Sequence, residues 1–286
     1  MSIRNFTDIR ALIIDMDGVL WHGSSPLPGL NEFFQCIREL RIPFILATNN
    51  SSLTQDQYLA KLQGMGIGVA RNEILTSSMA TASYLKERVK ASETTLYVIG
   101  EAGLRTPLSE EGFKLIHIDK LSDCDPEKLK ADYVICGLDR ALSWEKMAIA
   151  TLYLRAGAEF IATNADTSLP LEVGTVPGNG ATLAALQAAS GMTPTVIGKP
   201  QAIMYQQAIK FLGVAKESTI AIGDRLDTDI LGAVNAGIRS IMVLTGISAE
   251  QDLQQINYQP SWVMADLPTI THALQQCHDV ENLEEL

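Results

Sequence analysis

The chain has 286 residues, of which 47% are hydrophobic and 19% charged, a balance typical of a globular protein with a sizeable core. Its formal net charge of -11 excludes a general binder of the nucleic-acid backbone, because such binding needs clustered cations. The N-terminal residues MSIRNFTDIR lack the apolar stretch of a signal peptide and no apolar run approaches membrane-spanning length, so we expect a cytoplasmic protein with neither nucleic-acid nor membrane partners.

Short apolar runs alternate with longer amphipathic stretches along the chain. In chain order, strands are predicted at residues 11–15, 43–49, 94–100, 131–137, 158–164, 194–198, 218–224, 239–246 and 261–267. Helices are predicted between them, among others at residues 30–40, 53–66 and 144–155. Apolar strands without strict alternation, separated by helices, are typical of a mostly parallel sheet covered on both faces. The pattern therefore predicts an α/β fold, although composition marks no domain boundary.

The first predicted strand ends in two carboxylates, Asp15 and Asp17, directly before Gly18. Residues i and i+2 of a strand point the same way, so both carboxylates can face one pocket. In a doubly wound sheet, that pocket lies beyond the carboxyl ends of the strands. For an isolated pair of this kind, a polar strand cap serving the turn is the better interpretation.

Polar residues also follow the second predicted strand, beginning with Thr48. A hydroxyl and backbone amides at a strand end can form a cradle for phosphate. The alternative is helix capping, since Ser51, Ser52 and Thr54 are all favoured cap residues. Taken alone, this segment favours capping.

Two later strand ends carry further charges. Lys199 lies at a strand-to-helix junction, where its charge can hold a phosphoryl oxygen or remain solvated on the surface. The strand at 218–224 ends at Asp224, followed by Asp227 and Asp229, and such oxygen ligands suit Mg²⁺ beside phosphate. The alternative is that Asp227 and Asp229 stabilise a helix N-terminus. All the motifs follow predicted strands, and together they provide the groups that phosphoryl transfer requires.

In their order, these motifs resemble those of the haloacid dehalogenase-like hydrolase superfamily: Asp15-Met16-Asp17-Gly18-Val19, Thr48-Asn49, Lys199, and Gly223-Asp224 with Asp229. The phrases DMDGVLW, ATNNSS, GLDR, FIATN, PGNGA, GKP and GDRLDTDI are similar to the NagD-like and p-nitrophenylphosphatase branch. The resemblance covers essentially the whole chain. It implies a Rossmann-like, doubly wound parallel-sheet core at residues 1–78 and 181–286, with an inserted α/β cap domain at residues 79–180.

The resemblance also implies a Mg²⁺-dependent phosphatase that acts on a small phosphorylated metabolite. Asp15 would attack phosphorus and form an aspartyl-phosphate intermediate. Asp17 would act as general acid and then as general base, a role that requires a proton favoured by burial or by the nearby charge of Asp15. Mg²⁺ would be held by Asp15, Asp224 and the backbone carbonyl of Asp17. Asp229 would support the metal shell or Lys199.

By the same resemblance, phosphate binding is assigned to four residues: Thr48, Asn49, Asn50 and Lys199. The Thr48 hydroxyl and the Lys199 ammonium would stabilise the phosphoryl oxygens in the transition state. Contacts of the cap with the organic part of the substrate are assigned to four residues at predicted strand ends: Asp139, Arg140, Asn164 and Asp166. Arg140 has two equally open interpretations, a partner for a second anionic group of the substrate or a surface ion pair.

Several alternatives stay open at this stage. Relatives act on phosphoglycolate, pyridoxal phosphate, sugar phosphates, nucleotides and aryl phosphates, and the residues do not choose among these substrates. Capped relatives self-associate through the cap, so the resemblance implies a possible homodimer. A receiver-like module phosphorylated on Asp15 is a different class, but it would need neither Asp17 nor a cap. A catalytically inactive binding protein is another, and it would have lost a motif residue, whereas all are present.

Overall fold

The computed structural model describes residues 6, 8–125, 129–171 and 173–284, and it confirms the predicted α/β fold. Its contacts divide the chain into two compact units. The core unit comprises Met1–Thr48, Tyr58–Leu75 and Lys199–Leu286, and the inserted unit comprises Asn49–Gln57 and Thr76–Gly198. Among the described residues, no helix is both long and apolar enough to span a membrane.

The core unit is built on a six-stranded sheet in the order β15-β14-β13-β1-β4-β5. Its strands are β1 (Ala11–Ile14), β4 (Phe44–Thr48), β5 (Ile74–Thr76), β13 (Thr219–Gly223), β14 (Arg239–Val243) and β15 (Trp262–Met264). The pairings from β15 through to β4 are parallel. Every residue of β1, β4 and β13 is buried, which explains their uninterrupted apolar sequences. This is a Rossmann-like sheet, with β1 between β13 and β4.

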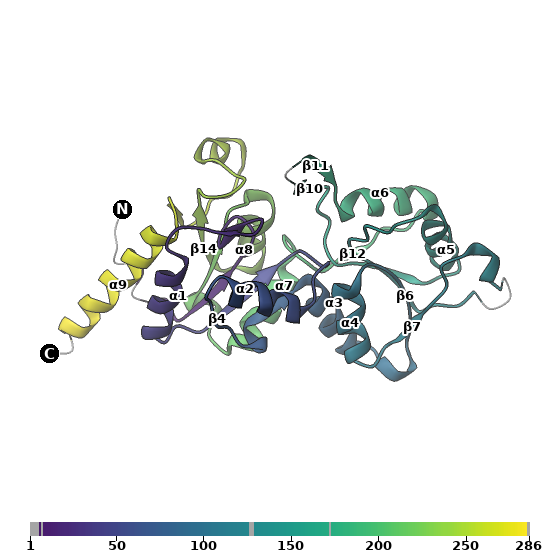
Figure 1. Ribbon diagram of the computed structural model, residues 1–286, viewed down its shortest axis with the longest axis horizontal. Coiled ribbons are helices and arrows are strands. Elements are labelled where there is room, and N and C mark those ends of the chain that lie inside the picture. Colours follow the sequence, from purple (N-terminus) through teal and green to yellow (C-terminus); the bar gives the residue numbers. More distant parts are fainter. Residues whose placement is uncertain (1–5, 7, 126–128, 172, 285–286) are drawn as a thin grey trace. The chain divides into compact units, whose positions relative to one another are not determined.

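Helices and short elements complete the core unit. The helices are α1 (Leu30–Glu39), α2 (Gln55–Gly64), α7 (Ala202–Leu212), α8 (Leu231–Ala236) and α9 (Leu267–Glu284), with a π-helical turn η6 (Leu226–Ile230) before α8. Helix α1 packs against α9 (Figure 1), and α7 packs against α8. The amphipathic α1 buries Phe33, Phe34 and Ile37. A small antiparallel hairpin of β2 (Trp21–His22) and β3 (Ser25–Pro26) follows β1.

The inserted unit has its own parallel sheet of five strands, in the order β12-β9-β8-β6-β7. Its strands are β6 (Thr95–Ile99), β7 (Lys114–Ile116), β8 (Tyr133–Cys136), β9 (Glu159–Ala162) and β12 (Thr195–Val196). Its helices are α3 (Ser77–Lys86), α4 (Ala102–Glu110), α5 (Trp144–Arg155) and α6 (Asn179–Ser190). An antiparallel hairpin of β10 (Ser168–Leu171) and β11 (Gly174–Pro177) precedes α6.

The inserted unit ends later than the sequence-based boundary at residue 180. Strand β12 pairs with β9 through Thr195 and Ile161, and α6 packs against α5, so both elements belong to this unit. An apolar strand looks the same in either sheet, and the pattern therefore does not reveal which sheet a strand joins. The unit extends to Gly198, directly before Lys199.

Candidate active site

Asp15 directly follows β1, in the interior of the core sheet. Its backbone N–H donates to the Ile222 carbonyl of β13 over 2.8 Å, which fixes the residue at the strand end. Its Oδ1 accepts a hydrogen bond from the Lys199 ammonium. Burial raises the pKa of Asp15 well above its usual range; the charge of Lys199 opposes this, whereas Asp229 and Asp224 add to it. Lys199 therefore favours the ionised form of Asp15.

Lys199 is buried, with 3% of its side chain exposed, so it is not the solvated surface lysine that the sequence left open. Its Nζ donates to Asp15, to Asp229 Oδ1 over 2.6 Å and to the Ala47 carbonyl over 3.1 Å. Burial alone would lower the pKa of Lys199, but the charges of Asp15 and Asp229 outweigh burial and raise it. The ammonium is thus held between two carboxylates.

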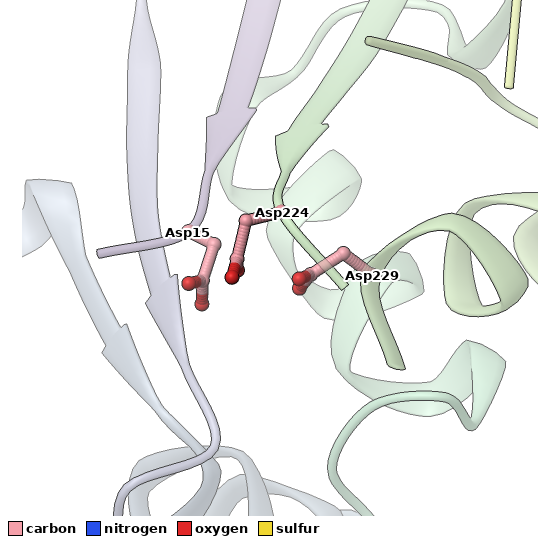
Figure 2. A group of neighbouring side chains, drawn as sticks. All are labelled: Asp15, Asp224 and Asp229. Carbon is pink, nitrogen blue, oxygen red and sulfur yellow. The ribbon is translucent and has the colours of Figure 1, made fainter. Parts of the chain in front are cut away.

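Three carboxylates converge beyond the ends of β1 and β13. Figure 2 shows Asp15, Asp224 and Asp229 close together, and one oxygen of each lies within 4.8 Å of the others. Asp229 is buried, and its Oδ2 accepts a hydrogen bond from the Arg225 N–H over 3.1 Å. Asp227 instead is exposed and pairs with the Arg225 guanidinium. The sequence left open that Asp227 and Asp229 stabilise a helix N-terminus, and the resemblance assigned a supporting role to Asp229. Asp229 is the one of the two that contacts Lys199.

Asp224 is buried in a tight backbone setting. Its Oδ2 accepts a hydrogen bond from the Ile247 N–H over 2.7 Å. A Cβ on Gly246 would lie 1.9 Å from this oxygen and one on Gly18 2.6 Å from it, so only glycine allows this close approach. Burial, followed by the charge of Asp229, raises the pKa of Asp224 to about 6. Asp224 Oδ1 is buried and has no hydrogen-bond partner among the described residues.

For Asp17, the sequence offered two features that would favour a proton, burial or the nearby charge of Asp15, and burial is absent. The side chain is exposed, and its Oδ1 accepts a hydrogen bond from the Trp21 indole N–H over 2.8 Å. Asp17 is not part of the carboxylate group described above. Its side chain is therefore accessible to a reacting molecule.

Thr48 and Asn50 occupy different settings. Thr48 is the buried last residue of β4, the strand next to β1. Asn50 Oδ1 accepts hydrogen bonds from the backbone N–H and the hydroxyl of Ser52, at 3.0 and 2.7 Å. At the start of α2, the capping acceptor is Thr54 Oγ1, which binds the Gln57 N–H over 3.3 Å. The capping alternative thus applies to Thr54.

Asn49 is bound into the inserted unit. Its Nδ2 donates to both carboxylate oxygens of Asp166, at 3.2 and 3.3 Å. Its backbone carbonyl accepts hydrogen bonds from Ser77 Oγ and Asn164 Nδ2, at 2.7 and 2.9 Å. Asn164 and Asp166 therefore hold the segment that follows Thr48, and Asn164 is buried.

The other two residues predicted to contact substrate form ion pairs within the inserted unit. Asp139 binds the Lys146 ammonium over 2.8 Å, and only 3% of its side chain is exposed. Arg140 donates to both carboxylate oxygens of Glu101, at 2.7 and 2.5 Å, while its own side chain is 69% exposed. The surface ion pair, one of the two interpretations of Arg140, is the arrangement that the structure contains.

Sequence reasoning missed the loop after β14. Thr245 Oγ1 donates to the Gly18 carbonyl over 2.7 Å, and Gly246 and Ile247 enclose Asp224. The signal was present, because residues 239–246 were predicted to form a strand of the same sheet and its carboxyl end reaches the same edge. None of these three residues has a charged side chain, so the pattern of strand-end charges does not include them.

Two family models match the chain, a haloacid dehalogenase-like hydrolase model over residues 12–114 and a HAD-hydrolase-like model over residues 196–270. An acid sugar phosphatase of Staphylococcus aureus (strain USA300) is 37% identical over 258 residues, which are 90% of this chain and 95% of that protein.

Solved structures agree with this match. A 4-nitrophenylphosphatase from Thermotoga maritima has a TM-score of 0.85 at 33% identity, over 95% of this chain and 99% of that one. A glycerol phosphate phosphatase from Mycobacterium tuberculosis, in complex with magnesium, has a TM-score of 0.82 at 31% identity, over 93% and 78%. The chain therefore belongs to the haloacid dehalogenase-like hydrolase family, and within it to the NagD-like branch of phosphatases that includes the p-nitrophenylphosphatases.

Proposed function

We propose that this chain is a Mg²⁺-dependent phosphatase that hydrolyses a small-molecule phosphate monoester through an aspartyl-phosphate intermediate on Asp15. The observation that carries the proposal is the meeting of Lys199 with Asp15, Asp224 and Asp229 at one edge of the core sheet. Buried ion clusters contribute little net stability to a fold. Phosphoryl transfer, in contrast, depends on positioned charges of both signs.

The carboxylate group fits a hard divalent cation. Mg²⁺ prefers oxygen ligands, and the buried Asp224 Oδ1 is an acceptor without a partner in the described part of the chain. We assign Asp15, Asp224 and the backbone carbonyl of Asp17 as its ligands, with Asp229 in a supporting position. Bound there, Mg²⁺ would supply positive charge beside the phosphoryl oxygens. The glycerol phosphate phosphatase, a similar structure that is in complex with magnesium, supports Mg²⁺ as the cation.

A substitution beside Asp224 tests the metal assignment without touching a ligand. In Gly246→Ala, the new Cβ would collide with Asp224 Oδ2, so the carboxylate must move. We expect the affinity for Mg²⁺, measured by titration calorimetry, to fall about tenfold, or roughly 1.4 kcal/mol. Gly64→Ala is the control, because a Cβ at Gly64 meets nothing within 4 Å. Unchanged affinity in Gly246→Ala would contradict the assignment.

The first half-reaction transfers the phosphoryl group to the protein. A carboxylate oxygen of Asp15 forms a bond to phosphorus while the bond from phosphorus to the ester oxygen breaks. Asp17 donates its proton to the departing alkoxide, which leaves as an alcohol. The Lys199 ammonium and the Thr48 hydroxyl stabilise the phosphoryl oxygens. We assign Asn49 and the neighbouring amides to the same cradle.

The second half-reaction restores the site. Asp17, now ionised, removes a proton from water as the water oxygen bonds to phosphorus. The bond from phosphorus to Asp15 breaks, and phosphate leaves. Two displacements at one phosphorus atom thus need one nucleophile and one carboxyl that alternates between acid and base.

We assign substrate selection to the inserted unit, as the cap. Relatives are named acid sugar phosphatase, 4-nitrophenylphosphatase and glycerol phosphate phosphatase, and these names favour a small sugar or polyol phosphate as substrate. The panel of candidate substrates to be tested therefore contains sugar phosphates and glycerol phosphate, together with phosphoglycolate, pyridoxal phosphate and nucleotides.

Phosphate release from p-nitrophenyl phosphate tests the proposed reaction. We expect hydrolysis with Mg²⁺, loss of at least about 99% of the activity on chelation, and recovery on adding Mg²⁺ back, because Mg²⁺ at this site would supply the positive charge that phosphoryl transfer requires. The same assay is then run with the metabolite panel. Hydrolysis that persists in chelator would contradict the metal dependence. A stable phosphoenzyme without turnover would favour the receiver-like alternative, and binding without chemistry the inactive one.

A further inference from the structure

The indole of Trp21 lies beside the first motif. Trp21 begins β2 and is fully buried, with 0% exposure. Its Nε1–H donates to Asp17 Oδ1 over 2.8 Å, and its backbone carbonyl accepts a hydrogen bond from the Gly18 N–H over 2.9 Å. Main chain and side chain of one residue therefore both bind the turn that carries Asp17.

A lysine side chain lies against the same indole ring. The Lys61 ammonium, on α2, lies 4.0 Å from the centroid of the Trp21 ring, in a cation–π arrangement. Burial lowers the pKa of Lys61, while the negative charge of Asp17 opposes the shift. The indole is thus fixed by packing, by its main chain and by a cation, whereas the carboxylate that it binds is exposed.

We infer that Trp21, supported by Lys61, is a positioning residue that orients Asp17 for proton transfer. The inference rests on the proposed role of Asp17 as general acid and base. An indole N–H can only donate, so Oδ1 serves as its acceptor whether the carboxyl is protonated or ionised. We place the transferable proton on Oδ2, for which the described residues provide no hydrogen-bond partner. The hydrogen bond to Oδ1 fixes the direction of Oδ2, so the carboxyl loses less rotational freedom when it transfers the proton in the transition state.

Simple core packing is the competing explanation, because a buried indole also needs an acceptor for its N–H. The two explanations differ in what the loss of the N–H would do. A packing role affects all substrates alike. A positioning role affects those substrates whose leaving group must be protonated.

Trp21→Phe separates the two roles, because it retains a buried aromatic ring for Lys61 and removes the N–H. The measured quantity is kcat/KM, which reports the steps up to departure of the leaving group, for p-nitrophenyl phosphate and for the best alkyl phosphate of the panel. We expect about a tenfold loss with the alkyl ester, the scale of one hydrogen bond to a charged group, and less than about a twofold loss with the p-nitrophenyl ester. Trp144→Phe, at an exposed tryptophan in α5, is the matched control and should change neither.

Equal losses with both esters, or no loss with either, would overturn the inference. Asp17→Asn, measured in parallel, should show the same selective loss to a greater degree. If it shows none, the proposed role of Asp17 fails, which is a distinct result from failure of Trp21 alone. If Trp21→Phe does not fold, as judged by thermal unfolding, Lys61→Met keeps the indole and must shift the ratio of the two kcat/KM values in the same direction. An unchanged ratio in that variant overturns the inference as well.

Discussion

Asp15→Asn is expected to abolish phosphate release while the protein stays folded. Asparagine has the same shape, but its amide cannot attack phosphorus, and loss of a nucleophile lowers kcat by at least about 10⁴-fold. Its Oδ1 can still accept the hydrogen bond of the Lys199 ammonium. Asp229 still pairs with the Lys199 ammonium in this variant, so the buried lysine keeps a charged partner and the protein should remain folded.

Steady-state hydrolysis of p-nitrophenyl phosphate measures the loss, and mass spectrometry after rapid acid quench looks for phosphate on the peptide that contains Asp15. The control is Asp227→Asn, an exposed carboxylate of the fourth motif that lies outside the carboxylate group. It should retain the activity of the unaltered protein. Substantial turnover by Asp15→Asn, or phosphate on another residue, would remove Asp15 as the nucleophile.

Lys199→Met is expected to lose both activity and stability. Methionine has a similar length, but it leaves Asp15 and Asp229 without the ammonium that both contact. Loss of a charge-stabilising donor in the transition state lowers kcat by about 10²–10³-fold. Breaking a buried ion pair by removing one partner reduces the free energy of unfolding by roughly 3 kcal/mol. Chemical denaturation and p-nitrophenyl phosphate hydrolysis measure the two effects.

The loss of stability in Lys199→Met should depend on pH. The charge of Lys199 lowers the pKa of Asp15, so removing it leaves that pKa higher still. Above about pH 4, the unfolded chain has lost the Asp15 proton, whereas the folded variant retains it to higher pH. The free energy of unfolding should therefore fall as pH rises toward neutral and recover as pH falls. Lys114→Met, at an exposed lysine, should show neither effect. A pH-independent loss would mean that Asp15 is not the unpaired charge.

Much of the site could be predicted because local sequence marks strand ends. Apolar runs located β1, β4 and β13. The polar residues at their carboxyl ends, Asp15, Thr48 and Asp224, then had to lie at one edge of a parallel sheet. The contacts of Lys199 could not be predicted in this way, because the local sequence of a lysine after an edge strand is the same whether its side chain is solvated or buried. Its burial depends on Asp229 and Ala47, which are distant in sequence.

By itself, the sequence determined the α/β class, the order of the motifs and the kinds of chemical group at the strand ends, because these depend on short-range periodicity and residue type. Only the tertiary structure decided that β12 joins the sheet of the inserted unit, and that Lys199 is buried in contact with Asp15, Asp229 and Ala47. It also decided that Asp17 lies exposed against an indole. The physical reason is that burial and pairing are set by segments far apart in the chain, and the local pattern contains no record of which distant partner each segment meets.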